Sequence, residues 1–261
     1  MSTQLLRLAR LAIWTLLGLI SANCYAQQQG FTLRAGVEYS SGQYGGTEDI
    51  DDIYVPITGI LVSGKWGFRA TIPYLQVKGP EGTELGPGGE PLPGTGDIVT
   101  ESGLGDIYLG LTYFDLYVSS DRRFLLDLTG KVKLGTADET KGLGSGENDY
   151  SIQLDGYRFF DSFSLFGTLG YKVRGQPSYS TLDDVWFVSV GGSLPVANRT
   201  RLGMSLNLSP SAYSDREDLR DISLYLSHWT QGSWRYSGYL SAGLSDSSPD
   251  MGAGFSVGYH F

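Results

Sequence analysis

The chain has 261 residues, a formal net charge of −9, one cysteine and 37 glycines. Its first 26 residues hold two arginines and no acidic residue, so the remainder carries a charge of −11. This acidic balance excludes nucleic-acid binding through a basic face, and a single cysteine excludes an intramolecular disulfide or a thiolate cluster.

The first 26 residues have the pattern of an export signal. Two arginines give a positive start, residues 11–20 form an apolar core, and Ala26 places a small residue at the cleavage position. A core of this length is too short to span a bilayer as a helix. We therefore predict a signal peptide over residues 1–26, cleavage that removes Cys24, and one exported domain over residues 27–261.

From residue 31 onward, apolar and polar residues alternate with the period of two that a β-strand gives. The last strand shows the pattern most strictly. Every second residue from Met251 to Phe261 is apolar or aromatic, and the residues between are Gly, Ser or His. Twelve strands are predicted, at about residues 31–41, 51–63, 66–77, 104–117, 123–134, 149–159, 163–174, 184–194, 200–211, 219–229, 234–244 and 251–261.

The connections between these strands alternate in length. Short turns such as 64–65 and 160–162 follow the even-numbered strands, and longer polar loops, above all 78–103, follow the odd-numbered ones. This asymmetry and an even strand count are typical of outer-membrane barrels. The predicted fold is all-β, a transmembrane antiparallel up-and-down β-barrel of about 12 strands in the bacterial outer membrane. A soluble β-sandwich would explain the alternation but not the loop asymmetry.

Aromatic residues gather near the ends of the predicted strands, as they do at the two interfaces of a membrane. We expect outer-membrane lipid and lipopolysaccharide as surroundings, and an aromatic C-terminal strand that contacts the barrel-assembly machinery. The long loops are acidic, which we interpret as solvated surface, with a divalent-cation link to lipopolysaccharide phosphates as the alternative. The interface aromatics predicted at the short-turn ends are Trp66, Phe163, Trp229, Trp234, Tyr259 and Phe261.

Charged residues recur on the polar face of the strands, where they must line a lumen, because a charge at mid-depth in lipid costs about 2–4 kcal/mol. They either pair across the lumen and brace its wall, or form a polar path with a slight preference for anions. The predicted lumen-lining residues are Arg34, Glu38, Arg69, Asp106, Asp127, Lys131, Lys133, Asp155, Lys172, Arg174, Arg201 and Arg235.

Motifs for catalysis or for a cofactor are weak. The two histidines, His228 and His260, lack the His-Glu-x-x-His spacing of a zinc site, and we expect no metal and no cofactor. An outer-membrane lipid hydrolase, which would need His228, is kept as an alternative, but no catalytic residue is assigned. The glycine-rich stretches at residues 103–106 and 142–149 are interpreted as tight turns into strands, because no helix follows to form a phosphate site.

These glycine-rich stretches also carry a resemblance. Residues 103–113 (GLGDIYLGLTY), 130–138 (GKVKLGTAD), 142–150 (GLGSGENDY) and 243–250 (GLSDSSPD) resemble the outer-membrane transporter family linked to the meta-pathway of phenol degradation. The resemblance implies a barrel that takes up or exports small, often aromatic or hydrophobic, molecules. The alternative is a plugged structural or surface-binding barrel, with loop 78–103 as the plug.

Overall fold

The computed structural model describes residues 29–85, 91–177, 181–213 and 216–261. The predicted signal peptide therefore lies outside the described residues. Within them, the helical structure is the short 3-10 helix η1 (Glu139–Lys141), and no helix is long and apolar enough to cross a membrane. The strands are β1 (Gly30–Gly42), β2 (Ile50–Ser63), β3 (Trp66–Pro80), β4 (Glu84–Leu85), β5 (Pro91–Leu92), β6 (Ile98–Leu104), β7 (Ile107–Val118), β8 (Phe124–Leu134), β9 (Asp149–Phe159), β10 (Ser164–Val173), β11 (Val185–Ala197), β12 (Thr200–Ser209), β13 (Leu219–Trp229), β14 (Trp234–Gly243) and β15 (Met251–His260).

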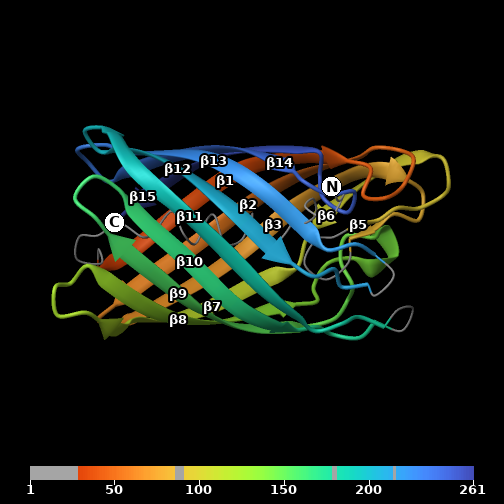
Figure 1. Ribbon diagram of the computed structural model, residues 1–261. Coiled ribbons are helices and arrows are strands. Elements are labelled where there is room, and N and C mark those ends of the chain that lie inside the picture. Colours follow the sequence, from red (N-terminus) through yellow and green to blue (C-terminus); the bar gives the residue numbers. More distant parts are fainter. Residues whose placement is uncertain (1–28, 86–90, 178–180, 214–215) are drawn as a thin grey trace, which may run out of the picture.

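The strands of the described residues form one antiparallel sheet of 13 strands that closes on itself, and the two-stranded hairpin β4–β5 (Figure 1). β6 and β7 both pair with β3, one above the other, and are separated by Gly105 and Asp106. They are therefore two halves of one barrel strand, so the wall has twelve strands in an up-and-down order, as predicted. Closure pairs each described strand of the wall with a neighbour on both sides, as a sheet in hydrocarbon requires, except β6, which pairs with β3 alone.

The first and last strands close the barrel. β1 pairs with β15 over ten residues, from Thr32 opposite His260 to Ser41 opposite Met251. The amide of Phe261 continues the ladder by donating to the carbonyl of Phe31 at 2.9 Å. The C-terminus thus lies at the short-turn end, on the left of Figure 1, and the long loops lie at the opposite end.

The alternation of the sequence becomes two faces of the wall. Large apolar side chains point outward and are exposed, including Leu240 at 64 % and Met204 at 54 %, whereas the intervening Ser, Thr, Asp and Arg residues are buried in the barrel. This is the reverse of a soluble protein and fits a lipid-facing surface. Aromatic rings meet in pairs at the short-turn end of this surface, with centroids 4.9 Å apart for Trp66 and Tyr113, and 4.8 Å for Trp234 and Tyr259.

The other predicted interface aromatics at this end differ from one another. Phe163 stacks on Phe160 at 4.4 Å, and Phe261 contacts Tyr259 edge-on at 4.9 Å; both Phe163 and Phe261 are exposed. Trp229, in contrast, lies directly opposite Arg235, whose guanidinium stands 4.7 Å above its ring. Residues opposite each other in a ladder share a face, so Trp229 belongs to the inner face and not to the lipid interface. The correction follows from the register of β13 and β14.

The long segment 78–103 is more ordered than a loop. β3 extends to Pro80 and β6 begins at Ile98. Both strands therefore reach further towards the long loops than the sequence pattern predicted. The segment between them contains the paired strands β4 and β5, and residues 86–90 are outside the described part of the chain. The predicted fourth strand therefore begins six residues early, because its first part pairs with the extension of β3.

The hairpin β4–β5 packs among the other long loops. Leu85 joins a buried cluster with Tyr44 and Ile50 from the first long loop and Leu143 from the third. On the other side, Leu92 contacts a second buried cluster; its members are Leu182, Ala212 and Tyr213. The hairpin is thus held by loops from several sides of the extracellular end.

Candidate functional site: the barrel lumen

The inner face of the wall carries all twelve charged residues predicted to line the lumen. Ten of them have the parity of the buried side chains in their strand, opposite to that of the exposed apolar ones, and Asp106 and Arg174, which lie next to strand ends, are buried. Because directly opposed residues share a face, the ladders also show which of these residues lie side by side. They separate into three groups, which are a network at the extracellular end, acids held by neutral donors, and basic residues along the wall.

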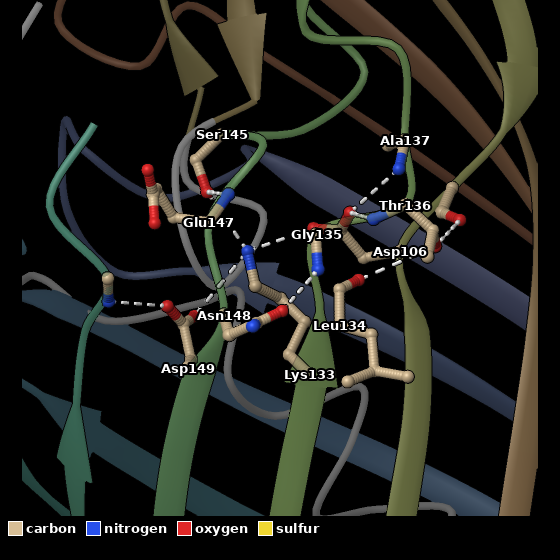
Figure 2. Close-up of polar contacts among 12 residues, drawn as sticks. Asp106, Lys133, Leu134, Gly135, Thr136, Ala137, Ser145, Glu147, Asn148 and Asp149 are labelled. Carbon is tan, nitrogen blue, oxygen red and sulfur yellow. Dashed lines mark hydrogen bonds and ion pairs between the residues drawn. The ribbon is translucent and has the colours of Figure 1, made fainter. Parts of the chain in front are cut away.

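The network at the extracellular end is centred on Lys133, which is only 4 % exposed (Figure 2). Its Nζ lies 2.9 Å from Asp106 Oδ2 and 3.6 Å from Asp149 Oδ2, and it donates to Ser145 Oγ at 3.1 Å. A buried charge is tolerated when it is paired and hydrogen-bonded in this way. The predicted lumen residues Lys133 and Asp106, together with Asp149, therefore brace the structure.

The same carboxylates hold the loop between β8 and β9. Asp106 Oδ1 accepts the amides of Thr136 and Ala137, both at 3.0 Å, and Asn148 Oδ1 accepts the amide of Gly135 at 2.9 Å (Figure 2). Asp149 Oδ1 accepts the amide of Gly175 from the next long loop. The network thus joins residues of three of the glycine-rich sequence stretches.

Glycines in these stretches allow backbones to touch. A Cβ at Gly142, which has a φ of +64°, would overlap the carbonyl of Thr83 at the base of the hairpin β4–β5. The amide of Leu85 donates to the carbonyl of Gly142 at 2.7 Å in the same contact. Nearby, hydrogen bonds from Thr140 hold the pKa of Asp138 below its usual value and fix the start of η1. The interpretation of these glycines as tight turns is consistent with this geometry.

The acids in the middle of the lumen accept hydrogen bonds from neutral neighbours. Asp155 accepts from Thr168 at 2.6 Å and from Gln153 at 2.8 Å. Asp127 accepts the amide of Asp115 at 2.8 Å, where β7 bulges and Asp115 has a φ of +52°. Asp127 therefore stabilises an irregular strand, a role that no single-strand pattern could indicate.

An aromatic layer lines the inner wall from β9 to β14, and the sequence analysis did not assign it a role. It is a buried cluster of Tyr157, Phe166, Tyr225 and Tyr239, in which the Phe166 and Tyr225 rings are 6.4 Å apart. The inward parity of these rings is visible in the sequence. Their contact is not, because Phe166 and Tyr225 are separated by two strands.

Glycines opposite these rings let the aromatic layer form. Gly191 opposes Phe166, Gly203 opposes Tyr225 and Gly254 opposes Tyr239. A Cβ added at any of these glycines would overlap the ring beside it. Each of the three opposed rings thus extends over the backbone of a neighbouring strand.

Tyr239 also lies close to the seam at which β1 and β15 close the barrel. Its ring passes over Gly254 on β15, and its hydroxyl donates to Glu38 Oε2 on β1 at 2.9 Å. Glu38 is 4 % exposed, so this bond satisfies an otherwise costly buried acid. The contact links three strands that come from the two ends of the chain.

The basic residues on the wall differ in their partners. Arg201 donates to Ser164 and Ser193, both at 3.0 Å from Nη2, and Arg235 covers the Trp229 ring. Arg69, Lys131 and Lys172 make no hydrogen bond or ion pair with any described residue. Arg34 and Arg174 complete the predicted set, and both are buried on the inner face.

The histidines lie at the short-turn end. His228 is on the outer face, where its Nδ1 lies 2.9 Å from Thr200 Oγ1. The Nδ1 of His260 lies 3.0 Å from Thr32 Oγ1 at the mouth of the lumen. Among the described residues, no three His, Cys, Asp or Glu side chains are grouped so as to hold a metal ion.

A family profile described as "Putative MetA-pathway of phenol degradation" matches residues 26–261. A search of curated proteins gives no match.

Among solved structures, an outer-membrane channel from Pseudomonas putida F1 is similar, with a TM-score of 0.73 at 12 % identity, over 92 % of this chain and 98 % of that one. The translocator domain of the autotransporter NalP from Neisseria meningitidis has a TM-score of 0.59 at 11 % identity, over 95 % and 94 %. The KdgM porin has a TM-score of 0.54 at 9 % identity, over 88 % and 99 %. At these identities the likeness concerns the fold.

Proposed function

We propose, from the premise that this chain belongs to the family described as "Putative MetA-pathway of phenol degradation", that it is an outer-membrane channel for small molecules, aromatic or hydrophobic ones included. The observation that carries the proposal is the composition of the inner face. It presents hydrogen-bonding and charged groups along the whole wall, inside a barrel whose outer face is apolar. A buried core would hold apolar side chains there instead.

The aromatic layer supports the part of the proposal that concerns the solute. Its four buried rings, those of Tyr157, Phe166, Tyr225 and Tyr239, form an apolar patch on an otherwise polar wall. A planar or apolar solute gains free energy by stacking on such rings, while its polar groups meet the serines and charges nearby. We assign no catalytic residue, since His228 is on the outer face with Thr200 as its partner.

The membrane partners belong to the same proposal. The exposed apolar belt suits outer-membrane lipid and lipopolysaccharide, and the exposed Phe261 at the end of β15 suits recognition by the barrel-assembly machinery. Export through a signal peptide over residues 1–26 would deliver the chain to that machinery.

A plugged barrel is the second candidate, and the hairpin β4–β5 favours it. Arg216 donates from Nη1 to the carbonyl of Pro91 on the hairpin at 3.0 Å and to the carbonyl of Tyr44 at 3.1 Å. Two buried clusters also hold the hairpin among the long loops, where a plug would have to sit. The two candidates differ in whether current passes through the folded protein.

Recordings in planar lipid bilayers test the proposal. The purified protein is expected to give discrete conductance steps, and Lys131→Ala is expected to change their size because Lys131 lies on the inner face. Lys65→Ala, at an exposed short turn, serves as the matched control and should leave the steps unchanged. A folded barrel that stays silent in repeated trials would exclude a channel and favour the plugged barrel.

A further inference from the structure

Five basic side chains form a continuous series on the inner wall, from the short-turn end to the long-loop end. We propose that this series, the basic staircase, selects small organic anions that carry a carboxylate; this specificity rests on the proposed channel function. The staircase consists of Arg235, Arg34, Arg69, Lys131 and Lys172.

The lower part of the staircase lies on one row of the ladder. Arg235 on β14 and Arg34 on β1 both oppose Gly258 on β15, so one residue without a side chain stands between two guanidinium groups. Neighbouring strands are about 4.8 Å apart, which separates the two Cα atoms by roughly 10 Å. The arms of two arginines easily cover that span.

The upper part lies on the next row. Arg69 opposes Gly110, which opposes Lys131; Lys131 in turn opposes Ser151, which opposes Lys172. A small residue again separates each pair of cations. The members of the series are close enough to repel one another electrostatically. This repulsion acts between Arg235 and both Arg34 and Arg69, between Arg69 and Lys131, and between Lys131 and Lys172.

The staircase also crosses the depth of the barrel. Arg235 is the second residue of β14, which starts at the short-turn end. Lys131 and Lys172 stand near the ends of β8 and β10, at the long-loop side. A solute that moves along the lumen therefore meets one cation after another.

The acids of the lumen do not pair directly with Arg69, Lys131 or Lys172 among the described residues. Asp155 is the acid whose field reaches both Arg69 and Lys131, yet the hydrogen bonds it accepts come from Thr168, Gln153 and Thr129. Arg69, Lys131 and Lys172 are left without a hydrogen-bonding or ion-pairing partner among the described residues. Lys133, in contrast, has a structural role, because two carboxylates surround its ammonium group.

Cations such as Arg69, Lys131 and Lys172 on the inner face of a barrel attract anions. A charged group held away from bulk water is costly unless a counter-charge reaches it, and pores for anions are lined by Arg and Lys for this reason. An arginine fork matches the two oxygens of a carboxylate, and the aromatic layer offers a surface for the rest of the solute.

Reversal potentials across a bilayer test the inference. With a KCl gradient the native channel is expected to prefer chloride over potassium, and with chloride replaced by benzoate it is expected to carry benzoate. The triple variant Arg69→Gln/Lys131→Gln/Lys172→Gln should lose this preference and shift the reversal potential towards that of a cation channel. The matched control removes three positive charges outside the lumen, by Lys65→Gln/Lys78→Gln/Arg123→Gln, and should retain the native value.

The possible outcomes distinguish failure of the staircase from failure of the channel function. A conducting native barrel without anion preference, or a triple variant with the native reversal potential, overturns the staircase but leaves the channel. A native barrel that carries chloride but not benzoate overturns the assignment to organic anions. A folded barrel that passes no current overturns the channel and the staircase together. If the triple variant does not assemble, Lys172→Gln alone carries the test, with a smaller shift expected in the same direction.

Discussion

Lys133 shows how a charged residue on the inner face can stabilise the structure around it. Asp106 from the connection between β6 and β7, Asp149 at the start of β9 and Ser145 from the preceding loop surround its ammonium, and all three come from the glycine-rich stretches. The spacing of those stretches therefore reflects the assembly of a buried ion network. Asp106 and Asp149 would lack a counter-charge without it.

Lys133→Met tests this role. Because it leaves two buried carboxylates without their cation, we expect it to lower the free energy of unfolding by about 3–5 kcal/mol, measured by urea denaturation in lipid vesicles. Lys131→Met on the same face of β8 is the control, since it removes a lysine that has no carboxylate partner. Equal effects of the two substitutions would contradict a bracing role for Lys133.

Gly254→Ala tests the packing of a ring against a glycine. The added methyl group must displace the Tyr239 ring and weaken its bond to Glu38, so we expect a loss of about 1–3 kcal/mol in unfolding free energy. Gly130→Ala is the control, because a Cβ at that position meets no atom within 4 Å. In a Tyr239→Ala background the cost of Gly254→Ala should largely disappear, and persistence of the full cost there would disprove the explanation.

At the scale of elements, the hairpin β4–β5 is the part that departs most from a simple barrel. Its flanks extend β3 and β6 beyond the level of the other strands, and its contacts reach loops on several sides. Such a closely packed connection is expected to limit flow through the entrance without altering the wall below it.

Arg216→Ala tests the hold on the hairpin. Removal of the guanidinium breaks two hydrogen bonds to backbone carbonyls, so we expect larger or more frequent conductance steps in planar bilayers, with the same ion preference. Arg123→Ala, an exposed residue at a short turn on the other end, is the control. If Arg216→Ala lowers or abolishes conductance, the hairpin does not restrict the entrance.

At the scale of the whole molecule, the seam between β1 and β15 decides whether a sheet becomes a barrel. Strands from the two ends of the chain must meet in register, and the last residues then lie beside the first strand. The Phe31 and Phe261 rings, 5.7 Å apart, cover this junction on the outer face.

Phe261→Ala is expected to reduce assembly in cells. It removes the final aromatic side chain from the strand that we propose the assembly machinery recognises, so less heat-modifiable barrel should appear in outer-membrane fractions. Phe163→Ala removes an exposed ring at another short turn and controls for the loss of interface packing alone. An equal loss in both variants would argue against a special role for the last residue.

The sequence by itself determined the class of fold, because a period of two reports which side chains share a face whatever the partner strand is. The strand order, the loop asymmetry and the inward position of Arg69, Lys131 and Lys172 all follow from that local rule. The rule does not report register between strands. For that reason it left the position of the hairpin β4–β5 open. Trp229 has the same inward parity as Tyr225, so its predicted place at the lipid interface, which came from its position beside a short turn, was wrong.

Only the tertiary structure decided which inward residues meet. Whether Lys133 braces a loop while Lys131, two positions earlier, has no partner depends on Asp106 and Asp149, which other strands bring to the same level. The contact between Phe166 and Tyr225 likewise depends on glycines of the two strands between them. Closure of the barrel brings inward residues that are distant in the sequence next to one another. This juxtaposition produces the aromatic layer and the basic staircase.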